Sequence, residues 1–305
     1  SIEKLENLLG QAVNSRLISD VPLGAFLSGG IDSSAIVAMM AKSGKKVNTF
    51  TIDFAEKTHS EIDDANLVAE HCKTEHKTLQ VSTQAIDDLP KLAWHFDEPF
   101  ADSSALPTYY VSKIAREHVT VILSGDGGDE LFAGYNSYQN RNEHALLMSL
   151  PAGLRRHVIG SIANAMPMQA PMRNLLKYAA YSSKEDGPGA LGLYPYIKED
   201  IVTRSTSVEL SKSDPVQAKR ELWANYEKLD KLTRMQLTDT KMYLPGDILV
   251  KVDRMSMANS LETRAPLLDY RMVEFAIGLP VNLKMKSGVS KYVLKQVLKN
   301  YVPPR

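Results

Sequence analysis

The sequence predicts an α/β fold in which a doubly wound parallel sheet is followed by a large helical C-terminal portion. Short apolar runs alternate with helical patterns over about the first 135 residues, which is typical of strands joined by crossover helices. One run, VTVILS at 119–124, is apolar or β-branched almost throughout, as a strand buried on both faces requires. Beyond residue 136 the strand patterns fade. We therefore expect an α/β core over residues 1–135 and a mainly helical portion over 136–305.

Each element of the core follows from the spacing of its apolar residues. Residues 2–19 place Leu5, Val13 and Leu17 on one stripe, which predicts an amphipathic helix before the sheet. The strands are expected at 23–27, 47–54, 76–81 and 119–124. The helices that join or follow them are expected at 33–42, 61–73, 83–94 and 104–118. Strands that alternate with helices in this way should lie parallel to one another.

The composition narrows the class of protein. Lys and Arg total 36, as do Asp and Glu, so no net charge attracts nucleic acid or anionic lipid, and any bound phosphate needs a local site. The one cysteine, Cys72, excludes a disulfide framework and a four-cysteine zinc site, and it fits a reducing compartment. No apolar run approaches the roughly 20 residues of a membrane span. We expect a cytoplasmic protein with neither nucleic-acid nor membrane partners; nothing in the sequence indicates its oligomeric state.

The first candidate site is LSGGIDSSA at 27–35, where a predicted strand turns into a helix. Gly29 and Gly30 leave room for a ligand to approach the backbone, and the free N–H groups and positive dipole of the helix start favour a phosphate. Neither the Walker pattern GxxxxGK[ST] nor the dinucleotide pattern GxGxxG matches this loop. A tight turn capped by Asp32 or Ser33 would account for the same residues without any ligand.

A second loop, SGDGGDE at 124–130, follows another predicted strand and holds three carboxylates within five residues. Strands of one parallel sheet end on the same side, so both loops should face one crevice. Asp32 from the first loop and Asp129 from the second could then share Mg²⁺, which takes one or two carboxylates plus phosphate oxygens. Turn capping would explain Asp126 and Asp129 separately, whereas the two loops together favour a nucleotide site.

Charged residues gather in two later segments. The segment 247–269 holds Lys251, Arg254 and Arg264 among apolar residues, as a solvated helix face would, or as a set of charges that converges on an anion. Lys291 lies at the start of a predicted helix, where a cation gains nothing from the helix dipole. A bound anion would explain a lysine at that place.

Taken together, these stretches resemble the synthetase domain of the asparagine synthase family. SGGIDSS at 28–34 is similar to the SGGxDSS motif of ATP pyrophosphatases, and LSGDGGDELFAGY at 123–135 to the family's SGExxDExFxGY segment. The segments 97–125, 253–269 and 288–298 also match the family in order and spacing, so the resemblance runs from about residue 2 to 305. It implies an adenine nucleotide alpha hydrolase-like fold with a PP-loop. It also implies a reaction that uses ATP and Mg²⁺: adenylation of a carboxylate with release of pyrophosphate, then attack by ammonia to give an amide and AMP.

The resemblance implies roles for the residues that match the family's motifs. Asp126 would accept the proton of the attacking nitrogen, at a position where the family usually carries a glutamate, one methylene longer. Lys291 and Arg254 would neutralise charge on the departing pyrophosphate, while Asp32 and Asp129 would hold Mg²⁺. The helical portion would complete the acceptor and pyrophosphate sites. Contacts to the nucleotide are implied for Leu27, Ser28, Gly29, Gly30, Asp32, Ser33, Ile52, Ser124 and Gly125.

The sequence leaves the acceptor open. The family implies the side chain of aspartate, but related enzymes act on sugar acids, β-lactam precursors or peptide precursors, and the discriminating pocket is expected at 97–108 with 257–264. A non-catalytic nucleotide-binding domain is a further alternative, which the presence of Asp32, Asp129 and Lys291 disfavours. Thiouridylases carry a similar loop, but they usually add reactive cysteines or nucleic-acid-binding modules, and one cysteine with no basic excess disfavours them.

Glutamine-dependent members of the family begin with a cysteine nucleophile in an N-terminal glutaminase domain. This chain begins at Ser1, in a segment that the family places after that domain, so we expect the glutaminase domain to be a missing partner. Cys72 lies between a predicted helix and a predicted strand and is expected to be a packing residue. Free ammonia would then be the nitrogen donor for this chain alone.

Overall fold

A five-stranded parallel sheet organises the structure. The computed structural model describes residues 1–44, 46–54, 62–81, 83–139, 149–167, 170, 172–181 and 217–303. The strands lie in the order β3-β2-β1-β4-β5, and every neighbouring pair is parallel, which confirms the predicted fold class. Their bounds are β1 (Leu23–Phe26), β2 (Asn48–Phe54), β3 (Glu75–Val81), β4 (Val121–Leu123) and β5 (Glu262–Arg264).

The strand order reverses between β1 and β4. From β1 the chain proceeds outward through β2 to β3, and it then returns to place β4 on the other side of β1, with β5 beyond it. Leu23 pairs with Val121 and Ala25 with Leu123, so the carboxyl ends of β1 and β4 are neighbours. In open parallel sheets, ligands bind in the crevice beyond such a reversal.

The strand β5 differs from the expectation, which placed no strand beyond residue 136. Its three residues, Glu-Thr-Arg, show no apolar pattern. It forms because its backbone pairs with the neighbouring strand: Glu262 N donates to Thr120 O at 2.9 Å, and Ser124 N donates to Arg264 O at 2.9 Å. Pairing with a distant segment decides this element, and such pairing leaves no local pattern in the sequence.

One face of the sheet is covered by helices that share the largest hydrophobic core. Leu9, Ile36, Met272 and Val297, from four different helices, are buried there beside Leu123 of β4. The helical stripe predicted near the start of the chain is confirmed, although that helix ends at Arg16. The four helices are α1 (Ile2–Arg16), α2 (Ile31–Lys42), α16 (Tyr270–Ile277) and α18 (Tyr292–Leu298).

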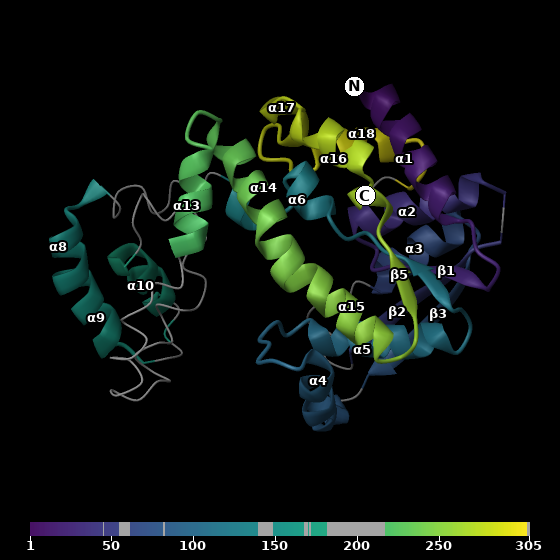
Figure 1. Cartoon of the computed structure of the whole chain (residues 1–305), viewed down its shortest axis with the longest axis horizontal. Helices are drawn as coiled ribbons and strands as arrows, with labels where there is room; N and C mark the ends of the chain where they lie inside the picture. Colours follow the sequence, from purple (N-terminus) through teal and green to yellow (C-terminus); the bar gives the residue numbers. More distant parts are fainter. Residues whose placement is uncertain are drawn as a thin grey trace. The chain divides into compact units, whose positions relative to one another are not determined.

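The opposite face is covered by a second group of helices. Ile122 points away from its neighbour Leu123, as alternation along a strand requires, and it packs with Phe50 and Leu261. On this side α5 packs against β2, and α15 packs against α5 and β5 (Figure 1). Tyr109 and Met255 are buried where the helices of this group meet. Their bounds are α4 (Leu89–Phe96), α5 (Ala105–Arg116) and α15 (Leu249–Met257).

The helix expected at 83–94 is divided in two. A 3-10 helix, η2 (Thr83–Asp88), precedes α4, and Pro90 lies in the first turn of α4. Proline has no N–H to donate, and its ring clashes with the carbonyl four residues earlier, so one continuous helix cannot pass through it. Cys72 follows α3 (Ile62–His71) and is half-buried against the main core, where burial raises the pKa of its thiol.

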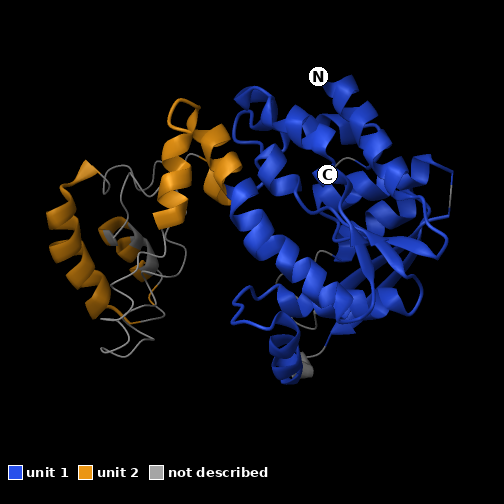
Figure 2. Cartoon of the chain, in the orientation of Figure 1, with its two compact units in different colours: residues 1–134, 239–305 blue, residues 135–238 orange. Residues whose placement is uncertain are grey.

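By its internal contacts the chain divides into two compact units (Figure 2). Unit 1 contains residues 1–134 and 239–305, so α15 and the helices after it belong with the sheet, and unit 2 contains residues 135–238. Within unit 2, Arg155 Nη1 donates to Ala179 O at 2.6 Å, and the Arg234 guanidinium lies 3.8 Å from the centre of the Trp223 ring. In the ranges that the structure describes, no helix has the length and apolar character needed to cross a membrane. The helices of unit 2 include α9 (Gly160–Ala165), α10 (Arg173–Tyr181) and α13 (Gln217–Asn225).

Asp269 ties α16 to α1 in unit 1. Its Oδ1 accepts from Arg271 N at 3.0 Å and from Arg271 Nε at 2.9 Å, which also caps the start of α16. Its Oδ2 accepts from Arg271 Nη2 and from Arg16 Nη1, both at 3.0 Å. The hydrogen bonds from Arg271, followed by that from Arg16, hold the pKa of Asp269 well below its usual range.

We expect Asp269→Asn to lower the free energy of unfolding by about 1–3 kcal/mol at pH 7, because asparagine can still cap α16 but leaves two guanidinium groups without their carboxylate. A carboxylate with a depressed folded pKa adds stability above its unfolded pKa, near 4, and loses it as the pH falls. The wild type should therefore lose stability from about pH 5 downward more steeply than the variant. Urea denaturation at pH 7 and pH 4 measures both, with Glu3→Gln, at an exposed position of α1, as the control. Parallel losses in the two proteins would contradict this role.

Candidate active site

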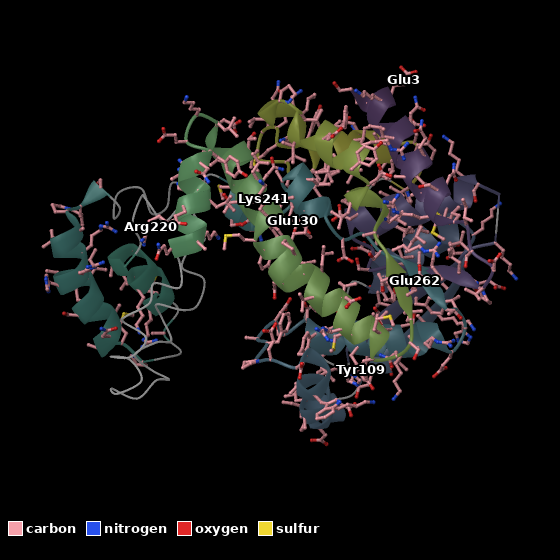
Figure 3. The ribbon with its side chains drawn as sticks, viewed as in Figure 1. Glu3, Tyr109, Glu130, Arg220, Lys241 and Glu262 are labelled. Atoms are coloured by element: carbon pink, nitrogen blue, oxygen red, sulfur yellow. The ribbon has the colours of Figure 1, made fainter. Side chains whose placement is uncertain are left out.

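Two glycine-containing loops begin where β1 and β4 end. The first loop, 27–30, leads into α2, and the second, 124–127, leads into α6 (Gly128–Phe132). Figure 3 labels Glu130 in α6, next to the second loop. Because β1 and β4 are neighbours in the sheet, the two loops meet at the point where the strand order reverses.

The first loop is shaped by hydrogen bonds among its own residues. The Ser28 N and Oγ atoms lie 3.2 and 3.1 Å from Ser33 Oγ, and Gly30 N donates to Ser28 Oγ at 3.2 Å. Gly29 has a φ of +74°, and a Cβ there would lie 2.7 Å from Ala65 N, so only glycine fits. Gly30 precedes the first residue of α2, so the free N–H groups of that helix start lie at this loop.

The second loop packs directly on Asp32. A Cβ added to Gly125 would lie 2.9 Å from both Asp32 Cβ and Ser33 N, and one added to Gly128 would overlap the Asp32 carboxyl group. A side chain at Gly125 would therefore push the loops apart, and one at Gly128 would displace the Asp32 carboxyl group. The absence of these side chains is what brings the carboxyl group of the first loop against the backbone of the second.

Lys291 connects the acidic residues of the two loops. Its ammonium forms ion pairs with Asp32 Oδ2 and, at 2.7 Å, with Asp129 Oδ1. Lys291 lies immediately before α18, and its N–H donates to Phe132 O at 3.1 Å. The structure thus brings together three of the predicted site residues from three separate parts of the sequence.

Burial and the neighbouring charges act against each other in this cluster. Removal from water raises the pKa of Asp32 to about 6, against the lowering effect of the Lys291 charge. Burial also disfavours the charge on Lys291, but the two carboxylates outweigh it and the pKa of Lys291 is raised. Asp32 Oδ1 is buried and has no hydrogen-bond partner among the residues that the structure describes. A buried carboxylate oxygen without a donor favours the arrival of a donor or a cation.

Asp126 lies in the second loop with its carboxyl group withdrawn from water. Its Oδ2 accepts a hydrogen bond from Ser124 Oγ at 2.6 Å. Burial raises the pKa of Asp126, and the hydrogen bond from Ser124 and the charge of Lys251 oppose this rise. A carboxylate with a raised pKa at a ligand-binding loop is suited to accept a proton.

The remaining predicted residues divide into two groups. Leu27 and Ser124 are buried at the ends of β1 and β4, and Ile52 is half-buried in β2. Arg254, in contrast, is exposed on α15, and no ion pair within the described ranges joins it to either loop. The structure therefore gathers the predicted loop residues and Lys291, and it leaves Arg254 exposed and without an ion pair to them in the described ranges.

An ion pair that the sequence pattern does not reveal lies close by. Lys251 Nζ is 2.6 Å from Asp102 Oδ2, and the two side chains are only 9% and 19% exposed. Asp102 Oδ1 accepts from Ser104 N and Ser104 Oγ, both at 2.8 Å. In the sequence Lys251 is one of several charges in 247–269, and nothing in their spacing indicates a partner 149 positions earlier. The pair ties α15 to the segment where the acceptor pocket was expected.

The whole chain matches a known family. The family model for asparagine synthase matches residues 4–305. The chain belongs to the asparagine synthase family. It is 35% identical over 303 residues to asparagine synthetase [glutamine-hydrolyzing] 1 of Bacillus subtilis (strain 168), and 26% identical over 320 residues to asparagine synthetase [glutamine-hydrolyzing] 3 of the same organism. It is also 25% identical over 352 residues to amidase chyE of Penicillium rubens.

Each of these alignments covers 99% of this chain but only about half of the relative: 47%, 46% and 50% of their lengths. The chain thus corresponds to one asparagine synthase-type ligase domain, and membership of the asparagine synthase family implies the use of ATP. The resemblance seen in the sequence motifs is confirmed.

Proposed function

We propose that this asparagine synthase domain transfers AMP from ATP to a carboxylate, releasing pyrophosphate, and that ammonia then attacks the acyl group to give an amide and AMP. The observation that carries the proposal is the meeting of Asp32, Asp129 and Lys291 between two glycine loops at the reversal point of the sheet. A carboxylate alone is a poor acceptor for ammonia, because oxide would have to leave. The mixed anhydride with AMP provides a better leaving group.

The chemistry of the donor set fits magnesium. Asp32 and Asp129 offer carboxylate oxygens from separate loops, and Asp32 Oδ1 is buried without a partner within the described ranges. In the same part of the chain no group of three or more His, Cys, Asp or Glu residues gathers to hold a metal, so phosphate oxygens would have to complete the coordination of the ion. When bound there, Mg²⁺ would stabilise charge on the departing pyrophosphate.

The chain's own residues have separate tasks in this proposal. Ser28, Gly29, Gly30 and Ser33, with the N–H groups at the start of α2, would bind the pyrophosphate. Lys291 would donate to the same phosphate oxygens and stabilise their negative charge as it develops. Asp126 would take the proton from the attacking nitrogen. Arg254 would also neutralise phosphate charge, a role that rests on the family resemblance alone.

The nucleotide base and the acceptor are assigned to neighbouring regions. Leu27 and Ile52 would flank the adenine, and Ser124 and Gly125 would contact the nucleotide from β4. We propose the side chain of aspartate as the acceptor, since relatives that are 35% and 26% identical to this chain are both named asparagine synthetases. For the whole protein we propose a cytoplasmic location and a glutaminase region that supplies the ammonia. For this chain alone, free ammonia would serve as the nitrogen donor in the test tube.

Gly128→Ala tests the contact between the two loops. We expect the variant to bind ATP at least about tenfold more weakly, because a Cβ would displace the Asp32 carboxyl group, and tenfold corresponds to about 1.4 kcal/mol. The fold should survive, since only a side-chain end is in the way. Isothermal titration measures the affinity. The matched control, Gly10→Ala in α1, has no neighbour within 4 Å of the added Cβ and should gain about 0.5–1 kcal/mol of stability. Unchanged ATP affinity in Gly128→Ala would count against the contact.

Pyrophosphate release with ATP, Mg²⁺ and ammonia across a panel of carboxylates tests the proposed reaction. We expect release with aspartate, with AMP and asparagine formed in equal amounts, and none when the carboxylate is omitted. Release with only a sugar acid or a β-lactam or peptide precursor would keep the adenylation and replace the acceptor. Formation of ADP and phosphate instead of AMP and pyrophosphate would reject the proposal, and binding of ATP without any product would favour a non-catalytic nucleotide-binding domain.

A further inference from the structure

We propose that Lys291 makes this site selective for a metal–nucleotide complex over a free divalent cation. The Lys291 ammonium occupies the place between Asp32 and Asp129 where a cation would bind. It moves away only when a bound phosphate is present as an alternative partner for its charge. The inference rests on the proposed nucleotide site, but it concerns a binding property that can be measured without turnover.

The geometry places the ammonium where a metal ion would compete with it. Lys291 Nζ contacts one carboxylate oxygen from each loop, Asp32 Oδ2 and Asp129 Oδ1. The Lys291 and Asp32 side chains are only 12% and 14% exposed, so water contributes little to the screening of this pair, whereas the Asp129 side chain is 37% exposed and its charge is screened more. A cation that binds both carboxylates must therefore displace the ammonium from at least one of them.

The balance of charge makes this competition strong. Two carboxylates and one ammonium give these three side chains one negative charge in excess, while the neighbouring Asp126 carboxyl group has the positive charge of Lys251 to balance it. A divalent cation added to the three side chains would leave one positive charge in excess in a largely buried place, which is unfavourable without a partner. If the ammonium leaves, the divalent cation and the two carboxylates are neutral together. The ammonium then needs another anion, and a triphosphate or pyrophosphate bound at the first loop would provide it.

The fold holds Lys291 in this position. Its backbone is left-handed, with a φ of 53°, a conformation that is unfavourable for a non-glycine residue and is retained when the surroundings require it. The hydrogen bond from Lys291 N to Phe132 O fixes the backbone beside α6. A Cβ on Gly134 would overlap both Lys291 Cε and Asp129 Oδ1, so the missing side chain at Gly134 gives this pair its space.

With only the ammonium bound, the carboxylate oxygens of the cluster do not all have partners. It binds Asp32 Oδ2, but Asp32 Oδ1 is buried and lacks a partner within the described part of the chain. A metal ion that arrives with phosphate oxygens brings more coordination to the carboxylates than one ammonium can. The cluster is therefore closed to the free cation and better satisfied by the cation bound to a phosphate.

Binding of Mn²⁺ in the absence of nucleotide, followed by electron paramagnetic resonance, tests the inference. We expect Lys291→Met, which keeps the length of the side chain and removes the charge, to bind Mn²⁺ at least tenfold more tightly than the wild type. The matched control is Lys295→Met, one turn further along α18, which removes a lysine that makes no ion pair with either carboxylate in the described ranges and should bind Mn²⁺ within twofold of the wild type. Adding Asp129→Asn to Lys291→Met should abolish the gain.

The unfolding temperature of the same variants, measured with and without Mn²⁺, is a second test. Without metal, Lys291→Met leaves two carboxylates facing each other, so it should unfold at a lower temperature than the wild type, and Mn²⁺ alone should restore most of that loss. In the wild type, a saturating non-hydrolysable ATP analogue should raise the affinity for Mn²⁺ at least tenfold. Equal Mn²⁺ affinity in the wild type and a folded Lys291→Met would overturn the inference. If that variant does not fold, the absence of coupling between Mn²⁺ and the analogue in the wild type would overturn it instead.

These results separate the inference from the proposed function. A clear gain in Mn²⁺ affinity with no pyrophosphate from any carboxylate would reject the reaction and keep the role of Lys291. Pyrophosphate release by the wild type without any gain in the variant would keep the reaction and reject the role.

Discussion

Asp32→Asn is expected to lower the rate of pyrophosphate release by about 10³-fold, the effect of removing a preorganised charged group from a site that stabilises developing charge. Asp32 is the residue on which both loops converge: Gly125 and Gly128 pack on it, and Lys291 pairs with it. Asparagine keeps the shape but removes the charge, so both Lys291 and a bound cation lose one of their two carboxylates. Single-turnover release of pyrophosphate from labelled ATP measures the loss.

Stability should move in the opposite direction, which distinguishes a functional residue from a structural one. Burial raises the pKa of Asp32 to about 6, so the folded state binds a proton more tightly than the unfolded state does. Stability from this group is therefore present at low pH and is lost as the pH rises from about 4 through the folded value. At pH 7 the variant should be at least as stable as the wild type. Asp63→Asn, on the exposed start of α3, is the control and should change neither quantity. A variant that keeps its rate, or that unfolds at pH 7, would refute this account.

Asp126→Asn is expected to separate the two chemical steps. Loss of a general base typically costs about 10²–10⁴-fold, so formation of the amide should fall by that factor. Exchange of pyrophosphate into ATP in the presence of the acceptor, without ammonia, should be retained, because adenylation needs no proton removed by Asp126. Both rates can be measured on one preparation, the first by amide formation and the second by isotope exchange.

Two further variants define what Asp126 does. Ser124→Ala removes the hydrogen bond to Asp126 Oδ2 at 2.6 Å, and a smaller loss of amide formation, below tenfold, is expected. Asp126→Glu restores the residue that the family usually carries and should retain amide formation, if the longer side chain reaches the same nitrogen. Should Asp126→Asn leave both the exchange rate and the amide-forming rate unchanged, the assignment of the base is wrong.

Local pattern in the sequence was sufficient for the elements whose own residues determine them. The run VTVILS predicts a strand buried on both faces, and β4 is found within it. The stripe through Leu5 and Val13 likewise determined α1. The helix expected at 83–94 failed at Pro90, where the pyrrolidine ring opposes a continuous helix. β5 could not be found, because Glu262 and Arg264 become a strand only through backbone bonds to the edge of β4.

The same division holds for the candidate site. The sequence by itself determined the two glycine loops and their carboxylates. In each case the strand, the small residues and the helix start follow one another directly in the chain, so their pattern is local. The tertiary structure alone decided that Lys291 lies between Asp32 and Asp129, that Lys251 pairs with Asp102, and that Arg254 stays exposed. Ion pairs between residues so far apart in the sequence depend on how whole helices pack against the sheet. That packing depends on the shapes of all the surfaces involved, so it cannot be inferred from a short run of neighbouring residues.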